Sequence, residues 1–153
     1  MDAITLLKAD HKKVEGLLKE IADLGDTAHV SRGKIFAEID RELTAHSDVE
    51  EKIFYPAFKA KTRPNTDSGD EVLEAYEEHA NVKAMIKKLE ALDPADETYN
   101  AKLQVLGELV KHHVKEEEGQ MFPEARKLMD ESELKDLGDK IAAAKERLLA
   151  TAH

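Results

Sequence analysis

The amino-acid sequence predicts an all-α protein, an up-down-up-down four-helix bundle with an additional short C-terminal helix. Ala, Leu, Lys and Glu dominate the composition, which favours helix over strand. Apolar residues recur at alternating steps of three and four, which is the periodicity of an amphipathic helix. The pattern of the first half also recurs in the second, as expected of two helical hairpins that pack together. The chain of 153 residues is expected to form a single domain, residues 1–153.

Capping and breaking residues delimit the five expected helices. Asp2 is the expected N-cap of the first helix, and Gly25 stops it. Pro56 is expected to kink or interrupt the second helix, and Pro123 to close or bend the fourth. Ser132 is the expected cap of the short fifth helix. The expected ranges are 2–24, 31–61, 70–92 and 98–122 for the bundle, a loop at Thr62–Gly69, and 132–149 for the C-terminal helix.

A polar segment that begins at His46 and ends at Pro56 recurs almost unit for unit from His113 to Pro123. In both copies a Glu follows the His by four residues, and an aromatic residue precedes the Pro. Residues four apart lie on the same face of a helix. Each copy therefore offers an imidazole and a carboxylate side by side, which is half of a metal site.

Two further His residues, His11 and His79, interrupt the apolar stripes of the first and third helices. The four stripe His residues are separated by 35, 33 and 34 positions. With the expected loops, this spacing predicts that His11, His46, His79 and His113 lie at a similar height along an antiparallel bundle. Each predicted hairpin then contributes one lone His and one His-x-x-x-Glu pair.

Each of these features alone has a commoner explanation. A lone His on an apolar stripe is more often a hydrogen-bonded core residue, and a His–Glu pair is usually an exposed salt bridge. Together they do not fit that explanation, because two carboxylates in a bundle core without cations would each cost several kcal/mol. No Lys or Arg falls on the four stripes near this level. The sequence therefore predicts a metal site formed by His11, His46, Glu50, His79, His113 and Glu117.

Four imidazoles and two carboxylates suit iron, and also zinc, manganese or copper. Two carboxylates are well suited to bridging a pair of metals. The Glu-x-x-His motif that ferritin-type di-iron bundles require is absent from the sequence.

These motifs resemble those of the hemerythrin family, specifically the bacterial hemerythrin-like HHE cation-binding domains. The resemblance covers essentially the whole chain and includes the Asp-His start, both His-x-x-x-Glu-Glu segments, Glu78-His79 and the fifth helix. It implies a non-haem di-iron centre with two Fe ions joined by an oxo or hydroxo bridge. Carried over by position, it implies that one iron is held by His11 and His46, the other by His79 and His113, and that Glu50 and Glu117 bridge them.

The sequence departs from the oxygen-carrying members of the family in two places. Ala75 and Lys83 stand four residues either side of His79, where those members carry a second His. The carboxylate of the fourth helix follows His113 by four residues rather than five. Both irons would then keep an open position, which favours a reactive or sensing centre over reversible oxygen carriage.

The function expected from these features is that of a di-iron protein that binds or reacts with O2, peroxide or nitric oxide. The alternative is a non-catalytic iron or oxygen sensor, or an iron-storage protein. The sequence leaves open whether the protein is an enzyme.

Two tyrosines and two glutamates adjoin the predicted site. Tyr76 is close enough to the face of His79 to ligate or hydrogen-bond there, although a packed interior Tyr is the commoner role; Tyr55 is less well placed. Glu51 and Glu118 follow the predicted ligands and are rotated away by about 100°, which favours outer contacts or solvent over ligation.

Composition excludes several other classes of protein. The chain has no Cys, so disulfides, Cys-ligated zinc, iron–sulfur clusters and thiol nucleophiles are unavailable. A net charge of −10 argues against nucleic acid and anionic membranes as partners. The sequence has no signal-peptide pattern and no long apolar run, so a cytoplasmic protein is expected. We expect small-molecule partners and a monomer or weak homo-oligomer. His112 is expected to face outward, and no role is assigned to His29 or His153.

Overall fold

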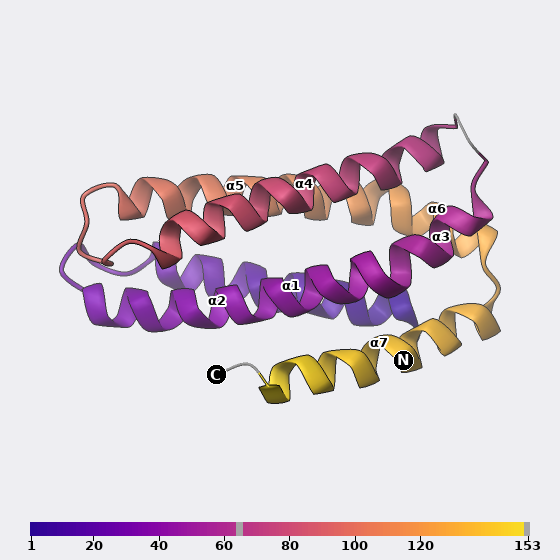
Figure 1. Ribbon diagram of the computed structural model, residues 1–153, viewed down its shortest axis with the longest axis horizontal. Helices are drawn as coiled ribbons and strands as arrows, with labels where there is room; N and C mark the ends of the chain where they lie inside the picture. Colours follow the sequence, from indigo (N-terminus) through magenta and orange to yellow (C-terminus); the bar gives the residue numbers. More distant parts are fainter. Residues whose placement is uncertain (64–65, 152–153) are drawn as a thin grey trace.

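The structure is a computed structural model that describes residues 1–63 and 66–151. Four helical rods lie side by side, and a further helix lies along the outside of two of them (Figure 1). Within the described residues every element is a helix, which confirms the all-α fold class. The elements are α1 (Ala3–Ala22), α2 (His29–Val49), η1 (Glu50–Phe54), α3 (Tyr55–Lys61), α4 (Asp67–Glu90), α5 (Tyr99–Glu116), η2 (Glu117–Met121), α6 (Phe122–Leu128) and α7 (Glu131–Thr151).

Side-chain caps set the starts of the first and third rods. The carboxylate of Asp2 accepts a hydrogen bond from the backbone N–H of Thr5 at 2.8 Å, as the sequence predicted for α1. The third rod begins at Asp67, three residues before the expected start, because the hydroxyl of Thr66 caps it by accepting from the N–H of Gly69. The expected loop is therefore shorter at its C-terminal end, and residues 64–65 lie outside the described part.

The C-terminal helix differs from the prediction in its length and in its cap. It has 21 residues, as many as α2, so it is not a short helix. Its cap is Asp130 rather than Ser132, since Oδ1 of Asp130 accepts a hydrogen bond from the N–H of Glu133 at 2.8 Å. Asp130 and Glu133 have the spacing of a capping box, which is a stronger start signal than the Ser inside the first turn.

Neither Pro56 nor Pro123 ends its rod. Each follows a short π-helical segment, η1 or η2, in which the N–H of Tyr55 donates to the carbonyl of Glu50 and the N–H of Phe122 to the carbonyl of Glu117. A Pro inside an α-helix leaves a carbonyl without its usual donor. The widened turn accommodates this loss, and such insertions are frequent at functional sites. The second and fourth rods are therefore continuous, with the predicted interruption reduced to one wide turn.

Two apolar clusters fill the bundle on either side of the polar level. The first lies toward the end where the chain starts, and its largest members are Phe54, Tyr55, Phe58 and Phe122. The second lies toward the opposite end and includes Ile21, Ile39, Ile86 and Leu106. The six predicted ligands therefore lie in the middle of a core that is apolar above and below them.

The last helix, α7, packs against α1 and α2 and stays away from α4 and α5 (Figure 1). Gly138 allows a close approach, because a Cβ at this position would overlap the backbone of Met1, Asp2 and Ala3. Farther along the helix, the ammonium of Lys145 contacts the carboxylates of Asp10 and Glu42. No helix in the described part of the chain combines the length and the apolar character that a bilayer-spanning segment needs.

Candidate metal centre

The structure brings all six predicted ligands together at one level of the bundle. Each is at most 6% exposed, and together they come from all four rods. The first rod supplies His11 and the third His79. The second supplies His46 and Glu50, and the fourth supplies His113 and Glu117, with each Glu at the first position of a π-helical segment.

Each carboxylate lies between imidazoles of the two hairpins. Oε1 of Glu50 is 2.9 Å from Nε2 of His46 on its own rod and 3.2 Å from Nε2 of His79 in the other hairpin. Oε1 of Glu117 is 3.1 Å from Nε2 of His113 and 3.0 Å from Nε2 of His11. Two donors that share a metal ion at about 2.1 Å lie about 3.0 to 3.4 Å apart. The observed spacings therefore match donors that share cations, and each Glu is placed to bridge.

Two overlapping groups of donor atoms emerge from this geometry. One group consists of His11, His46, Glu50 and Glu117, and the other of Glu50, His79 and His113; within each group the donor atoms lie within 4.8 Å of one another. The four clustered His residues are thus divided between the two groups in the same pairs that the family resemblance implies. Glu50 belongs to both groups, as expected of a carboxylate between two positions for an ion.

An outer carboxylate lies near Nδ1 of each of the four clustered imidazoles, and for all but His79 the contact is a hydrogen bond. Nδ1 of His46 is 2.8 Å from Asp10, and Nδ1 of His113 is 2.9 Å from Glu78. In the same way Glu118 lies 2.6 Å from Nδ1 of His11, and Glu51 lies 3.6 Å from Nδ1 of His79. A carboxylate on Nδ1 fixes the orientation of an imidazole and makes Nε2 the free donor, which is the usual support of a metal-bound His.

For Glu51 and Glu118 the sequence favoured outer contacts or solvent over ligation, and the outer roles of Asp10 and Glu78 were missed. A signal was available, because each of these residues directly precedes a lone stripe His. One residue of offset rotates a side chain by about 100° on a helix, toward the neighbouring rod rather than toward the stripe. The neighbouring rod carries the His that each carboxylate contacts.

Tyr55 is the main residue that the sequence placed wrongly. Its hydroxyl lies 2.7 Å from Oε2 of Glu117, 3.3 Å from Oε1 of Glu50, and 3.2 Å from Nε2 of both His79 and His113. On a regular α-helix five residues rotate by about 500°, so Tyr55 would point about 140° away from Glu50. The π-helical segment takes an extra residue per turn and brings the ring back to the same face.

The other aromatic neighbours of the site make packing contacts. Tyr76 packs against the ring of Tyr55 with centroids 5.3 Å apart, and its hydroxyl donates to the backbone carbonyl of Glu51 at 3.2 Å, away from the donor atoms. Phe122, at the position that matches Tyr55 in the second copy of the motif, stacks on the ring of His11 at 5.7 Å. The centre is therefore asymmetric, with a hydroxyl on one side and a hydrocarbon ring on the other.

The remaining His residues lie apart from the six. His112 is 65% exposed, as predicted. His29 begins α2, and its Nδ1 accepts a hydrogen bond from the guanidinium of Arg32 at 3.1 Å. His153 lies outside the described residues.

Without a bound cation, protons would hold the cluster together. Burial by itself lowers the pKa of His46, but the charge of Glu50 and the hydrogen bond to Asp10 outweigh it and raise the pKa to about 10. For Glu50, burial raises the pKa, yet the charge of His46 outweighs it and holds the pKa well below its usual range. Burial, and then the charges of Glu50 and Glu117, raise the pKa of the Tyr55 hydroxyl well above its usual value. A metal cation would take the place of these protons.

Three buried donor atoms of the cluster lack a hydrogen-bond partner. Among the described residues these are Oε2 of Glu50, Nε2 of His46 and Nδ1 of His79. The His46 nitrogen is close to Oε1 of Glu50 but is not in line for a hydrogen bond. Buried polar atoms are rarely left without a partner. A cation between Glu50 and His46 would give Oε2 of the one and Nε2 of the other a partner, so the residues present fit a metal ion.

A small cavity of about 20 Å³ adjoins the donor cluster. This volume holds about one water-sized molecule. Its walls are made by the four ligand-candidate imidazoles, by Asp10 and Ser47, and by aliphatic side chains, most of which lie three residues from one of the His residues. The aliphatic residues are Val14, Leu43, Val82, Val110 and Val114.

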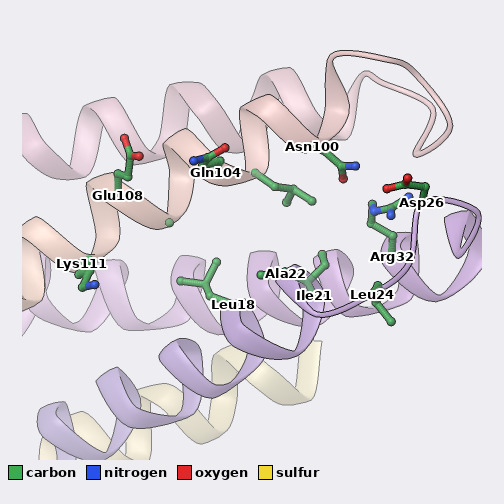
Figure 2. Close-up of a pocket in the computed structure, with 12 residues that line it drawn as sticks. Leu18, Ile21, Ala22, Leu24, Asp26, Arg32, Asn100, Gln104, Glu108 and Lys111 are labelled. Atoms are coloured by element: carbon green, nitrogen blue, oxygen red, sulfur yellow. The ribbon is translucent and has the colours of Figure 1, made fainter.

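A separate groove of about 550 Å³ between α1 and α5 contains none of the predicted ligands (Figure 2). Leu18, Ile21 and Leu103 contribute apolar side chains to it. Charged side chains line it as well: Arg32 and Lys111 are positive, and Asp26 and Glu108 are negative. It has no converging set of donors, and the metal centre is therefore the buried cluster.

Comparisons with known proteins agree with this geometry. The family model described as the hemerythrin HHE cation binding domain matches residues 2–125. The crystal structure of a hemerythrin HHE cation binding domain-containing protein from Mycobacterium kansasii, a homolog of Rv2633c, superposes with a TM-score of 0.84 at 26% identity and covers 99% of this chain and 89% of that one.

Two curated relatives extend the comparison. Rv2633c of Mycobacterium tuberculosis is 28% identical over 149 residues, which are 97% of this chain and 88% of that protein. A DNA nickase of Nostoc sp. is 26% identical over 148 residues, and this chain spans 40% of that longer protein. The family model matches most of this chain, and the structure contains a buried His/Glu cluster. These two findings show that this chain belongs to the family of hemerythrin HHE cation-binding domains.

Proposed function

We propose that this protein is a non-haem di-iron protein that binds or reacts with O2, peroxide or nitric oxide inside the bundle. His11 and His46 would hold one iron, and His79 and His113 the other. Glu50 and Glu117 would bridge the two ions, in keeping with the position of each carboxylate between imidazoles of both hairpins.

The donor set favours iron over other cations. Each ion would have two imidazoles and a share of two bridging carboxylates, with a position left open, and imidazole with carboxylate is the donor combination of many non-haem iron sites. Tyr55 adds a phenolic oxygen within 3.3 Å of both bridging-carboxylate candidates, which favours a hard, oxidised ion. Bound iron would supply redox chemistry and Lewis acidity at this position.

The observation that carries the proposal is the size and lining of the cavity beside the imidazoles. About 20 Å³ admits a diatomic molecule or a peroxide but no organic substrate. Apart from the imidazoles, Asp10 and Ser47, its lining is aliphatic, and this hydrocarbon favours an apolar gas over bulk water.

The protein's own residues would orient the metal-binding imidazoles and supply a proton. The outer carboxylates of Asp10, Glu78 and Glu118 accept hydrogen bonds from Nδ1 of three imidazoles and so hold their Nε2 atoms inward. Tyr55 holds a proton on its hydroxyl and donates it in a hydrogen bond to Oε2 of Glu117. Cation binding would lower the pKa of this hydroxyl and free its oxygen as a further donor.

A non-catalytic sensor or iron store is the second candidate, and the contact between α7 and the centre favours it. Asp10 contacts both His46 and Lys145 of α7, so a change at the ligand could reach an outer helix. If iron loading controls the docking of α7, limited proteolysis should cut α7 faster in the metal-free protein. Identical digestion patterns with and without iron would dispose of this candidate.

We propose one cytoplasmic domain, residues 1–153, acting as a monomer or weak homo-oligomer on small molecules. The DNA nickase similarity does not favour a nucleic-acid partner, because the matched region is 40% of that protein and a net charge of −10 opposes binding to DNA.

The test uses the anaerobic, reduced, iron-loaded protein. Oxygen is admitted while the visible and near-ultraviolet spectrum is recorded, and oxygen is then removed. We expect a rapid change that is not reversed by deoxygenation; reversal would assign the protein to oxygen carriage. Glu50→Ala should lose both the iron-dependent spectrum and the reaction.

A cavity-filling variant tests the route of the small molecule. Val82→Leu should bind as much iron as wild type and react more slowly with O2, because the added methylene occupies the cavity. Val105→Leu is the matched control, since Val105 is 42% exposed on the outer face of α5. Equal rates in all three proteins would contradict the assignment of the cavity as the reaction pocket.

A further inference from the structure

We propose that Glu78, His112 and Glu116 form a separate, exposed site for a divalent cation, from which Fe2+ enters the buried centre. The site lies where α4 and α5 face each other on the surface. Its existence does not depend on the proposed function, whereas its role as an entry site rests on the proposed iron centre.

The three side chains already converge as ligands would. Nε2 of His112 lies 3.0 Å from Oε1 of Glu116, one turn along α5, and 3.4 Å from Oε2 of Glu78 on α4. Donors that share an ion at about 2.1 Å lie about 3.0 to 3.4 Å apart. Glu78, His112 and Glu116 also line a broad surface groove of about 920 Å³, so a hydrated ion has access to them.

Glu78 links this surface group to the buried centre. One of its oxygens is 2.9 Å from Nδ1 of His113, and the other faces His112. A second small cavity of about 10 Å³ is lined by Glu78 and Glu116 on one side and by His113 and Glu117 on the other. The surface donors and a bridging-carboxylate candidate therefore border the same space.

The negative charge at this surface lacks a fixed counterion. Among the described residues, the ion-pair partners of Glu78 and Glu116 are His112 and His113, with no Lys or Arg. Glu71 lines the same small cavity as Glu78 and Glu116, and burial, followed by the charges of Glu124 and other acidic neighbours, raises the pKa of Glu71. A concentration of like charge attracts divalent cations.

The other half of the duplicated bundle shows what occupies the equivalent position. Asp10 corresponds to Glu78 and likewise contacts an inward-facing His, His46. There the outer oxygen of the carboxylate contacts Lys145 of α7. In the second half no helix covers this face in the described structure (Figure 1).

The residues around the two carboxylates differ accordingly. Ala45 and Val49 occupy the positions of α2 that match His112 and Glu116 of α5. One half thus has a built-in ammonium and apolar residues at these two positions, whereas the other has two added ligands and no ammonium. This exchange indicates that a mobile cation takes the place of the ammonium.

Mn2+ is the probe for the site itself. The iron-loaded protein is titrated anaerobically with Mn2+, and free Mn2+ is counted by electron paramagnetic resonance. We expect one additional ion in wild type and none in His112→Ala/Glu116→Gln. Glu20→Gln, which removes an exposed carboxylate on α1, should still bind one. No additional ion in wild type, or one retained by the double variant, would overturn the site.

The Glu50→Ala variant tests whether the surface site binds a cation independently of the buried iron centre. If the buried centre fails to hold iron in the variant, the surface group should still bind one Mn2+, because none of its three ligands is changed. If wild type proves to hold no iron at its centre, the same Mn2+ titration still decides the surface site.

The entry role is tested by the rate of iron uptake. Fe2+ is mixed anaerobically with metal-free protein, and uptake is followed by quenching of tyrosine fluorescence. The double variant should load about tenfold more slowly than wild type, since it has lost local attraction for the cation, and should reach the same final iron content. Equal loading rates would show that Fe2+ enters elsewhere.

Discussion

The hydroxyl of Tyr55 lies 2.7 Å from Oε2 of Glu117, although the two residues are 62 positions apart in the sequence. The contact exists because η1 rotates Tyr55 onto the face of Glu50. The matching position of the fourth rod holds Phe122, which stacks on His11. A single hydroxyl thus makes an otherwise duplicated centre asymmetric, so the two metal positions should differ in their chemistry.

Tyr55→Phe tests this asymmetry. The oxidised, iron-loaded variant should lose the visible phenolate-to-iron charge-transfer absorption while keeping its iron, because six other donors remain. Tyr76→Phe is the control and should keep the absorption, since its hydroxyl contacts a backbone carbonyl. Unchanged absorption in Tyr55→Phe would mean that this oxygen is not a ligand.

Lys145→Met should destabilise the protein by about 2 kcal/mol, because Asp10 and Glu42 then stay buried without their shared cation. Metal affinity should also fall about tenfold, because Asp10 orients His46. Urea unfolding and competition with a chelator measure the two effects. Lys135→Met, on an exposed pair of the same helix, should change stability by less than about 0.5 kcal/mol. Similar values for the two variants would refute a special role for Lys145.

Gly138→Ala should destabilise the protein by about 2 kcal/mol or more, because the new Cβ overlaps the backbone of Met1 to Ala3 and displaces α7. Gly16→Ala is the matched substitution on α1, where the Cβ meets no atom within 4 Å. It should stabilise the helix by about 0.5 to 1 kcal/mol. Thermal unfolding of both variants decides the point, and a neutral Gly138→Ala would mean that α7 does not dock closely.

The stability of the metal-free protein should fall as pH rises. His46 has its pKa raised from 6.5 to about 10, so its charged form is favoured by folding. That contribution is fully present below pH 6.5, the unfolded value, and is lost as pH rises through about 10. Over the same interval the increase in Tm on adding metal should grow, because fewer protons must be displaced. Thermal melts with and without metal test both; a metal-free Tm that rises toward pH 10 would contradict the prediction.

Much of the fold and of the candidate site follows from local patterns. The 3.6-residue periodicity identified the rods, and the four-residue spacing of His46 and Glu50 placed both side chains on one face. The similar heights of the four His residues followed from counting along the rods. The structure confirms the all-α bundle and brings the six residues together, while their role as iron ligands stays a prediction.

What the sequence by itself determined is therefore periodic and short in range: the helical rods, their apolar faces and the polar level of His and Glu within them. Only the tertiary structure decided which carboxylate faces which imidazole, since Asp10 meets His46 across two rods. It also decided that Tyr55 enters the centre, because a widened turn before Pro56 breaks the regular rotation on which sequence patterns depend. Contacts across rods, and departures from regular geometry, depend on how whole helices pack, and no local pattern encodes that.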